Sequence, residues 1–188
     1  MNPKLSILIC SLECRAVSFF KVLSSIWGQI HDPEEVQILF EVDDGTLPIG
    51  AKRNKLITRA RGDYLCFVDD DDEISSNYVT QILEAIVSEP DCVGIKLKYF
   101  RDDVCQGVAH HSKIYDTWRT KQLGTGSYFY ERTPNHINPI KSSIAKCIKF
   151  PDVDFGEDRE WSLRIYPLLK THVEIEEIIY FYKFNSKK

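Results

Sequence analysis

Five consecutive carboxylates occupy residues 69–73, directly after the apolar segment 64–68. Carboxylates this close repel one another at neutral pH unless a cation or solvent compensates them. Their oxygen atoms are the ligands that Mg²⁺ and Mn²⁺ favour, and both ions keep coordination positions for water and substrate phosphates. One interpretation is therefore a divalent-metal site that binds a diphosphate. The alternative is a solvated acidic loop before a helix whose N-terminus favours negative charge.

A second pair of carboxylates, Glu157 and Asp158, follows Gly156 at the start of a predicted helix. Free backbone N–H groups and the helix dipole keep a carboxylate ionised at such a position. The pair could be a plain helix cap. It could also supply a general base, which takes the proton of an acceptor hydroxyl from about 3 Å away.

The elements that must position these groups follow from hydrophobic periodicity. Apolar runs predict buried strands over 5–10, 36–42, 64–68 and 92–100, and helical spacing predicts helices over 16–30, 51–60 and 79–86, the last with Ser75 or Ser76 as N-cap. This alternation predicts a doubly wound α/β sheet, mostly parallel and flanked by helices. Ligands of such sheets bind at the carboxyl ends of the strands, so the polar residues after the first three strands should converge.

The second half of the chain has a weaker pattern. Residues 101–150 show no strong period, and we expect a long irregular stretch there, of the kind that is usually functional. A helix over 156–169, kinked or shortened by Pro167, and a strand over 173–182 complete the prediction. No internal repeat or linker divides the chain, which indicates a single domain.

Composition sets the protein class. The 188 residues are 43% hydrophobic and 28% charged, as in a globular domain. The net charge of −4 provides no broad basic field for nucleic acid or an anionic membrane. The six cysteines lack CxxC spacing, and the sequence lacks a membrane-spanning run or signal peptide, so we expect a cytoplasmic protein with reduced thiols.

Four segments in order, LSILICSLECR, ILFEVDDG, GAKRNKLITRARGDYLCFVDDDDEIS and FGEDREW, resemble the family 2 glycosyltransferases of the GT-A fold, a Rossmann-like architecture. The resemblance implies an inverting transferase that moves a sugar from a nucleoside diphosphate sugar, usually a UDP-sugar, to an acceptor hydroxyl with Mn²⁺ or Mg²⁺ as cofactor. It also implies that residues 1–100 bind the nucleotide sugar, and that residues 101–188 bind the acceptor and supply the base.

Roles in nucleotide and metal binding carry over by position. Cys10 and Leu12 border the nucleoside pocket, and Asp44 contacts the base, with Asp43 as a second candidate. The family's DXD-type motif falls on residues 69–71. Asp71 is the expected direct metal ligand, Asp69 shares the metal or meets ribose or water with Asp70, and Asp72 is expected to be solvated.

Arg53 has two interpretations, as support for the diphosphate region or as an interior ion-pair partner of the acidic loop. Asp158 falls on the aspartate of the family's ED motif and inherits the role of catalytic base, with Glu157 and Trp161 nearby. His136 is a candidate for lining the donor or acceptor cleft, although a lone loop histidine is more often structural.

Two departures from the family pattern stand out: Leu12 replaces a common aromatic residue, and a late histidine is missing after Tyr182. The alternatives are a non-catalytic nucleotide-sugar-binding module and a sugar nucleotidyltransferase, although SLECR lacks the Gly-rich loop of the latter. The acceptor stays open among a glycan, a lipid, a protein and a modified nucleic-acid base.

Overall fold

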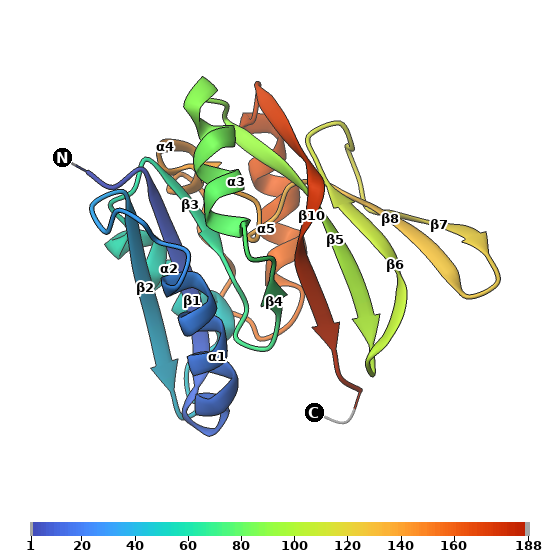
Figure 1. Cartoon of the computed structure of the whole chain (residues 1–188), viewed down its shortest axis with the longest axis horizontal. Coiled ribbons are helices and arrows are strands. Elements are labelled where there is room, and N and C mark those ends of the chain that lie inside the picture. Colours follow the sequence, from blue (N-terminus) through green and yellow to red (C-terminus); the bar gives the residue numbers. More distant parts are fainter. Residues whose placement is uncertain (1, 187–188) are drawn as a thin grey trace.

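The computed structural model describes residues 2–186, in which ten strands form one continuous sheet. The first half follows the predicted alternation of strands and helices (Figure 1). Its elements are β1 (Leu5–Leu12), α1 (Ala16–Trp27), β2 (Val36–Asp43), α2 (Ile49–Arg59), β3 (Tyr64–Phe67), β4 (Glu73–Ile74), α3 (Tyr78–Ala85) and β5 (Cys92–Arg101). The α/β class predicted from the sequence is thereby confirmed.

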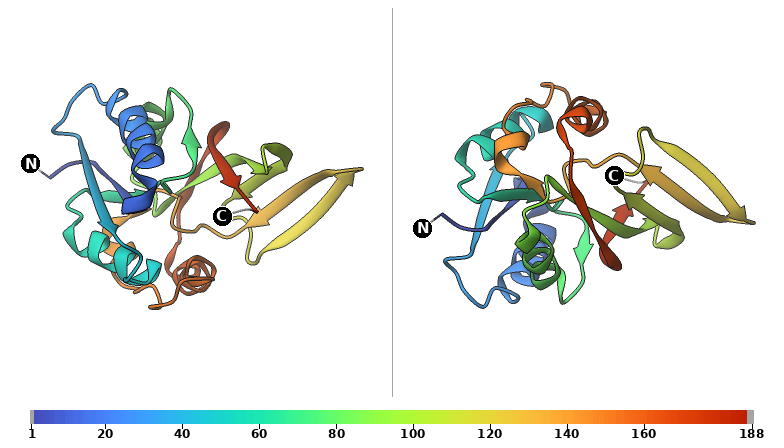
Figure 2. Two further views of the ribbon diagram at one scale, coloured as in Figure 1. Left: turned by 90° about the horizontal axis from the view of Figure 1, so that it is seen from below. Right: turned by 90° about the horizontal axis from the view of Figure 1, so that it is seen from above.

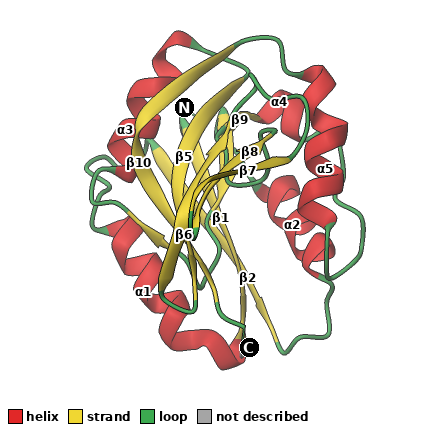
Figure 3. Ribbon diagram, turned by 90° about the vertical axis from the view of Figure 1, so that its right-hand side faces the viewer, coloured by secondary structure: helices red, strands yellow, loops and turns green. Residues whose placement is uncertain are grey.

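Strand β1 lies at the centre of the N-terminal part of the sheet, where it pairs in parallel with β2 and with β3. Its side chains alternate between two apolar cores, because Leu5, Ile7 and Ile9 pack on one face and Leu8 and Cys10 on the other. Helices α1 and α3 cover the first face, and α2 and the later helices cover the second (Figure 3). The continuous apolar run of β1 is explained by this two-sided burial.

The prediction of an irregular stretch over 101–150 is wrong. This part of the chain contains β6 (Val104–His111), β7 (Arg119–Gly124), β8 (Ser127–Arg132), β9 (Ile140–Lys141) and α4 (Ser142–Ala145). All six residues of β7 are exposed, so the strand has none of the apolar alternation by which strands are recognised. Together β7 and β8 form an antiparallel hairpin that projects from the body of the domain (Figure 2).

The C-terminal elements return to the first half. Helix α5 (Glu157–Ile165) ends in a 3₁₀ turn that contains Pro167, which confirms the predicted shortening. Strand β10 (His172–Phe184) then pairs in parallel with β5 and antiparallel with β4. The sheet is therefore mixed, with its parallel β2–β1–β3 part beside the predicted ligand edge.

The start of α3 differs from the prediction. The N-cap residue is Asn77, not Ser75 or Ser76, and no side chain caps the helix. The hydroxyl of Ser75 instead donates to Asn77 Oδ1 at 2.7 Å. Three shorter 3₁₀ helices lie at Glu13–Arg15, Ile86–Ser88 and Tyr166–Leu168. None of the helices within residues 2–186 is both long and apolar enough to cross a bilayer.

Candidate active site

The polar residues predicted to converge do so around a cleft of about 910 Å³. Its walls come from the ends of β1 and β3, from α2, from the N-terminus of α5 and from the β7–β8 region. The residues that line it include Cys10, Leu12, Arg15, Lys52, Arg53, Asp69, Asp70, Asp71, Trp118, Arg132, His136, Asp154, Glu157, Asp158 and Tyr182. The cleft is within the usual size range of a small-molecule site.

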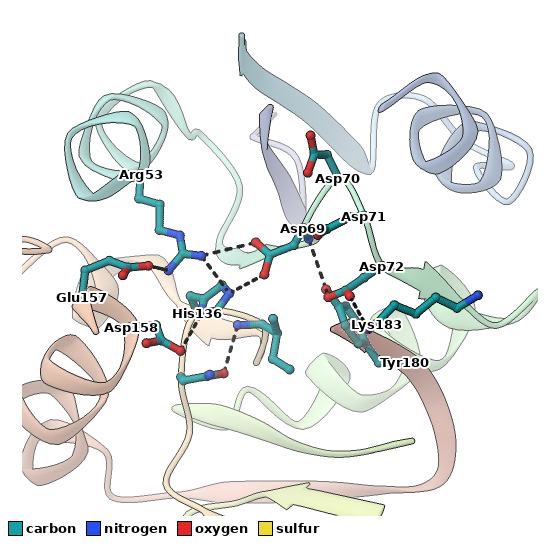
Figure 4. A network of polar contacts seen from close by, with 12 residues as sticks. Arg53, Asp69, Asp70, Asp71, Asp72, His136, Glu157, Asp158, Tyr180 and Lys183 are labelled. Carbon is teal, nitrogen blue, oxygen red and sulfur yellow. Dashed lines mark hydrogen bonds and ion pairs between the residues drawn. The ribbon is translucent and has the colours of Figure 1, made fainter. Parts of the chain in front are cut away.

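Asp69 is the first carboxylate of the acidic loop, and its two side-chain oxygen atoms contact Arg53 and His136 (Figure 4). Its Oδ1 accepts a hydrogen bond from Arg53 Nη2 at 3.3 Å, and its Oδ2 lies 3.2 Å from His136 Nε2. Burial would raise the pKa of Asp69, but the charges of His136 and Arg53 outweigh burial and hold the pKa well below its ordinary value. Asp69 is therefore ionised, and both of its side-chain oxygen atoms already contact protein groups.

Asp70 and Asp71 differ in how far their side chains are exposed. Asp70 is buried and accepts hydrogen bonds from Ser11 Oγ at 2.7 Å and from Arg15 Nη1 at 2.9 Å. The side chain of Asp71 is 24% exposed, and its Oδ2 lies 3.5 Å from the same Arg15 nitrogen. Asp71 is thus more accessible from the cleft than Asp70, and its exposed fraction equals the 24% of Asp69, whose oxygen atoms contact Arg53 and His136.

The prediction that Asp72 is solvated is wrong. Asp72 is 2% exposed, and it accepts hydrogen bonds from Tyr180 Oη at 2.7 Å and from the Lys183 backbone N–H at 2.8 Å. The pairing of β4 with β10 turns this carboxylate away from the cleft and into the sheet (Figure 4). Burial and the negative charge of Asp69 raise the pKa of Asp72 well above its ordinary value.

Arg53 links the acidic loop to the start of α5. Besides Asp69, it donates from Nη1 to Glu157 Oε1 at 2.7 Å. Its guanidinium carbon lies 5.5 Å from the ring centre of Phe67 and 5.4 Å from that of Phe150. The structure therefore places Arg53 as an interior ion-pair partner of the acidic loop, the second of its two interpretations, and also at the wall of the cleft.

The two carboxylates at the start of α5 occupy different environments. Glu157 is buried, and burial raises its pKa although the charge of Arg53 opposes this shift. The Asp158 side chain is 28% exposed to the cleft, and its Oδ1 accepts the Arg159 backbone N–H at 2.7 Å. Gly156 provides the left-handed backbone, with a φ of 82°, from which the helix begins.

His136 lies between the acidic loop and Asp158, at the centre of the polar network (Figure 4). The residue is 6% exposed, and its Nε2 lies 3.1 Å from Arg53 Nη2 as well as near Asp69. Its Nδ1 is 4.0 Å from Asp158 Oδ2 and has no hydrogen-bond partner among residues 2–186. The structure thus places His136 at the cleft wall, whereas the sequence left open whether it lines the cleft or is a structural loop residue.

Of the four other residues predicted to bind the nucleotide sugar, two line the cleft and two do not. Cys10 and Leu12 line the cleft, and burial raises the pKa of the Cys10 thiol to about 12. Asp43 instead accepts a hydrogen bond from Lys52 Nζ at 2.6 Å, and Asp44 is an exposed turn residue that accepts the Thr46 N–H at 3.1 Å. Neither aspartate is among the residues that line the cleft.

Trp161, predicted near the cleft, lies in the core. It is 0% exposed, stacks on Phe150 with ring centres 4.6 Å apart, and donates to the Ile148 carbonyl at 2.9 Å. Sequence reasoning missed the cleft residues Arg15, Lys52, Trp118, Arg132 and Tyr182. Arg15 and Lys52 lie inside the motifs quoted above, and Tyr182 lies in the predicted last strand, whereas Trp118 and Arg132 belong to the stretch 101–150 for which no element was predicted.

A metal site made by the protein alone is absent from residues 2–186, because no three His, Cys, Asp or Glu side chains are suitably grouped there. Mg²⁺, however, is usually held by one or two carboxylates together with substrate phosphates. The partly exposed Asp71 in the cleft, with its oxygen ligands, fits such a shared site.

Comparison with known proteins places this geometry in context. The chain matches crystal structures of S. aureus TarS residues 1–349: the complex with UDP at a TM-score of 0.71 and 18% identity, and the complex with UDP-GlcNAc at a TM-score of 0.68 and 15% identity. These matches cover 96% of the chain and 60% and 58% of the TarS chains, so the chain spans about three fifths of their length. They confirm the GT-A type fold.

A search of curated proteins by sequence found no match. The family model of glycosyl transferase family 2, in contrast, matches residues 38–149, from β2 through the acidic loop to the segment that contains His136. This match covers more than half of the chain, and the chain therefore belongs to glycosyl transferase family 2.

Proposed function

We propose that this protein transfers a sugar from a UDP-sugar to an acceptor hydroxyl, with a divalent metal ion as cofactor and with inversion at the anomeric carbon. The observation that carries the proposal is the placement of Asp71 and Asp158 on the same cleft, one in the acidic loop and the other at the start of α5. The first carboxylate can help hold a diphosphate through a metal ion, and the second can take a proton.

The cleft supports a nucleotide-sugar donor through its charges as well as its volume. Arg15 and Lys52 line it and supply positive charge for a diphosphate. Cys10 and Leu12 offer apolar contacts at the end of β1, where the nucleoside is expected. The complexes of TarS with UDP and with UDP-GlcNAc support UDP as the nucleotide.

In the proposed reaction Asp158 accepts the proton of the acceptor hydroxyl. The acceptor oxygen forms the new bond to the anomeric carbon as the bond from that carbon to the diphosphate oxygen breaks, and UDP leaves with the electron pair. Arg53 and Glu157 fix the start of α5, so Asp158 needs little reorganisation. Bound metal would neutralise charge on the departing diphosphate, and Asp71 is the residue that would hold it.

The compartment is part of the proposal. All six cysteines, which lie within the described residues, are free thiols, and three of them are exposed. Free exposed thiols are typical of reducing compartments, which supports a cytoplasmic protein.

The proposal is tested by titration calorimetry of UDP, UDP-glucose and UDP-GlcNAc, each with Mg²⁺ and with EDTA. We expect binding that requires the ion, and slow release of UDP from at least one donor when water replaces the acceptor. The anomeric configuration of the released sugar, read by NMR, tests inversion. Absence of UDP binding with either Mg²⁺ or Mn²⁺ would contradict the proposal, and binding without any turnover would indicate a non-catalytic module.

A further inference from the structure

A second, smaller cavity of about 280 Å³ adjoins the cleft. The two share the lining residues Asp69, Trp118, Arg132, His136, Asp158 and Tyr182. The cleft takes its other walls from β1, α2 and the loop before α5, whereas the small cavity takes them from β5, β6 and β8. The row formed by Asp69, His136 and Asp158 therefore lies between the two spaces.

Part of the wall of the small cavity is aromatic. Tyr99, Trp118, Tyr130 and Tyr182 line it, and we call these four residues the aromatic subsite. The ring centre of Tyr99 lies 5.3 Å from that of Tyr130 and 5.4 Å from that of Tyr182. Contacting rings of this kind are rigid and present faces of weakly negative potential.

Arg132 fastens this wall to the projecting hairpin. Its guanidinium carbon lies 5.0 Å from the Trp118 ring centre and 5.2 Å from that of Tyr130. Its Nη1 donates to the carbonyls of Arg119 at 2.6 Å and Glu131 at 2.8 Å. Because backbone carbonyls already engage Nη1, the guanidinium of Arg132 is held against the rings of Trp118 and Tyr130.

The polar groups of the cavity favour an uncharged ligand. Asp69 and Asp158 contribute two carboxylates against the one guanidinium of Arg132. Burial, followed by the charge of Arg132, lowers the pKa of His111 to about 3, so its ring is neutral. His136, nine-tenths buried, brings its unpartnered Nδ1 to the same wall.

We propose that the aromatic subsite binds a neutral pyranose ring of a carbohydrate acceptor, an inference that rests on the proposed function. A pyranose has apolar, weakly positive C–H faces and a rim of hydroxyl groups. The faces would stack on the rings, while one hydroxyl reaches the carboxylate of Asp158. In-line displacement requires the acceptor to approach from the side opposite the diphosphate, and the small cavity adjoins the donor cleft across Asp158.

The inference is tested by saturation-transfer NMR with three probes: the methyl β-pyranosides of glucose, galactose and N-acetylglucosamine. Each is titrated into the protein with and without saturating UDP and Mg²⁺. We expect at least one probe to bind the UDP-loaded protein, to receive saturation mainly at its ring C–H protons, and not to be displaced by UDP.

Tyr130→Leu removes an aromatic ring from the wall while keeping an apolar side chain, and Tyr128→Ala is the matched control. Tyr128 lies on the same strand, contacts Tyr130 at 6.1 Å between ring centres, and does not line the cavity. We expect Tyr130→Leu to weaken probe binding roughly three- to tenfold, and Tyr128→Ala to leave it unchanged, with both variants folded by thermal melting.

Three results would overturn the inference: no probe binds the UDP-loaded protein, UDP displaces the bound probe, or both variants weaken binding equally. A loss of UDP-GlcNAc affinity in Tyr130→Leu, with UDP affinity unchanged, would also overturn it, because the subsite would then hold the donor sugar. Failure of the proposed function is read separately, as absence of UDP binding to the wild type, while the probe arm without UDP still reports on the subsite.

Discussion

The acidic loop after β3 brings Asp69, Asp70 and Asp71 to the cleft, and the start of α5 brings Glu157 and Asp158. Each region contains an adjacent pair, Asp70 with Asp71 and Glu157 with Asp158, in which one carboxylate is buried and its neighbour is partly exposed. In the loop, Asp70 is buried against Arg15 while the Asp71 side chain is 24% exposed. At the helix, Glu157 is buried against Arg53 while the Asp158 side chain is 28% exposed. The buried member positions the chain, and its neighbour is left for chemistry.

The two pairs differ in the arginine that compensates them. The side chain of Arg15 is 35% exposed, whereas that of Arg53 is 5% exposed and lies between two aromatic rings. The loop can therefore readjust when a cation and diphosphate arrive, but the helix start is fixed before any ligand binds. This difference suits a metal site that is completed by the substrate and a base that is preorganised.

Replacing the exposed helix carboxylate should have the largest effect on turnover. Asp158→Asn keeps the shape of the side chain and removes the base, so UDP release from the donor should fall by about 10²- to 10⁴-fold. UDP affinity, measured by calorimetry, should stay the same. Asp154→Asn is the matched control, since Asp154 is an exposed carboxylate on the same cleft; a similar loss there would remove the special role of Asp158.

Replacing the fixed arginine should have the largest effect on stability. Arg53→Met leaves Asp69 and Glu157 without their shared buried cation, and the free energy of unfolding in urea should fall by about 3–5 kcal/mol. Arg59→Met is the control on the same helix, because the side chain of Arg59 is 52% exposed where it pairs with Glu41. That change should cost under about 1 kcal/mol. Equal losses would show that the helix start is no more rigidly held than the surface.

Replacing the exposed loop carboxylate should act on metal-dependent binding and not on folding. We expect Asp71→Asn to weaken UDP binding in Mg²⁺ roughly 100-fold. Loss of a group that only orients a metal ligand costs up to about 100-fold, and Asp71 would contact the metal itself. The melting temperature without UDP should change little. If Asp71→Asn bound UDP normally in Mg²⁺, the metal would have to be held elsewhere.

Much of the first half of the fold was predictable because its elements are buried on regular faces. Strand β1 is apolar except at Ser6 and Ser11, and α1 places Phe19, Val22 and Ile26 on one face. The hairpin of β7 and β8 was not predictable, since β7 buries no residue and is held by backbone pairing and by Arg132. Local sequence reports burial better than it reports strand pairing.

The candidate site was likewise predictable only in part. The convergence of residues 69–71 and Asp158 could be predicted, because strand ends and a helix start fix where these side chains must lie. The burial of Asp72 could not, since it depends on β10 returning more than a hundred residues later to supply Tyr180 and Lys183. Asp44 was a strand-end residue too, but the turn after β2 directs it to solvent.

The buried histidines His111 and His136 also differ in their charged neighbours. His136 lies beside two carboxylates, whereas His111 is buried near Arg132 with its pKa lowered to about 3. The pKa of His111 is thus lower in the folded state than in the unfolded state, so the unfolded state binds a proton that the folded state does not. Stability is fully present above the unfolded pKa of about 6.5 and falls as the pH drops from there toward 3.

His111→Gln should remove this contribution, which is at most about 1.4 kcal/mol per pH unit for one proton. The measurement is urea unfolding at pH 7 and pH 5, comparing the change in unfolding free energy between the two pH values, so that any constant cost of the substitution cancels. His31→Gln, at an exposed histidine, should keep the wild-type pH dependence. If His111→Gln kept it as well, the pKa of the folded ring would have to lie near the unfolded value of about 6.5, and the ring would be charged, not neutral, at pH 5.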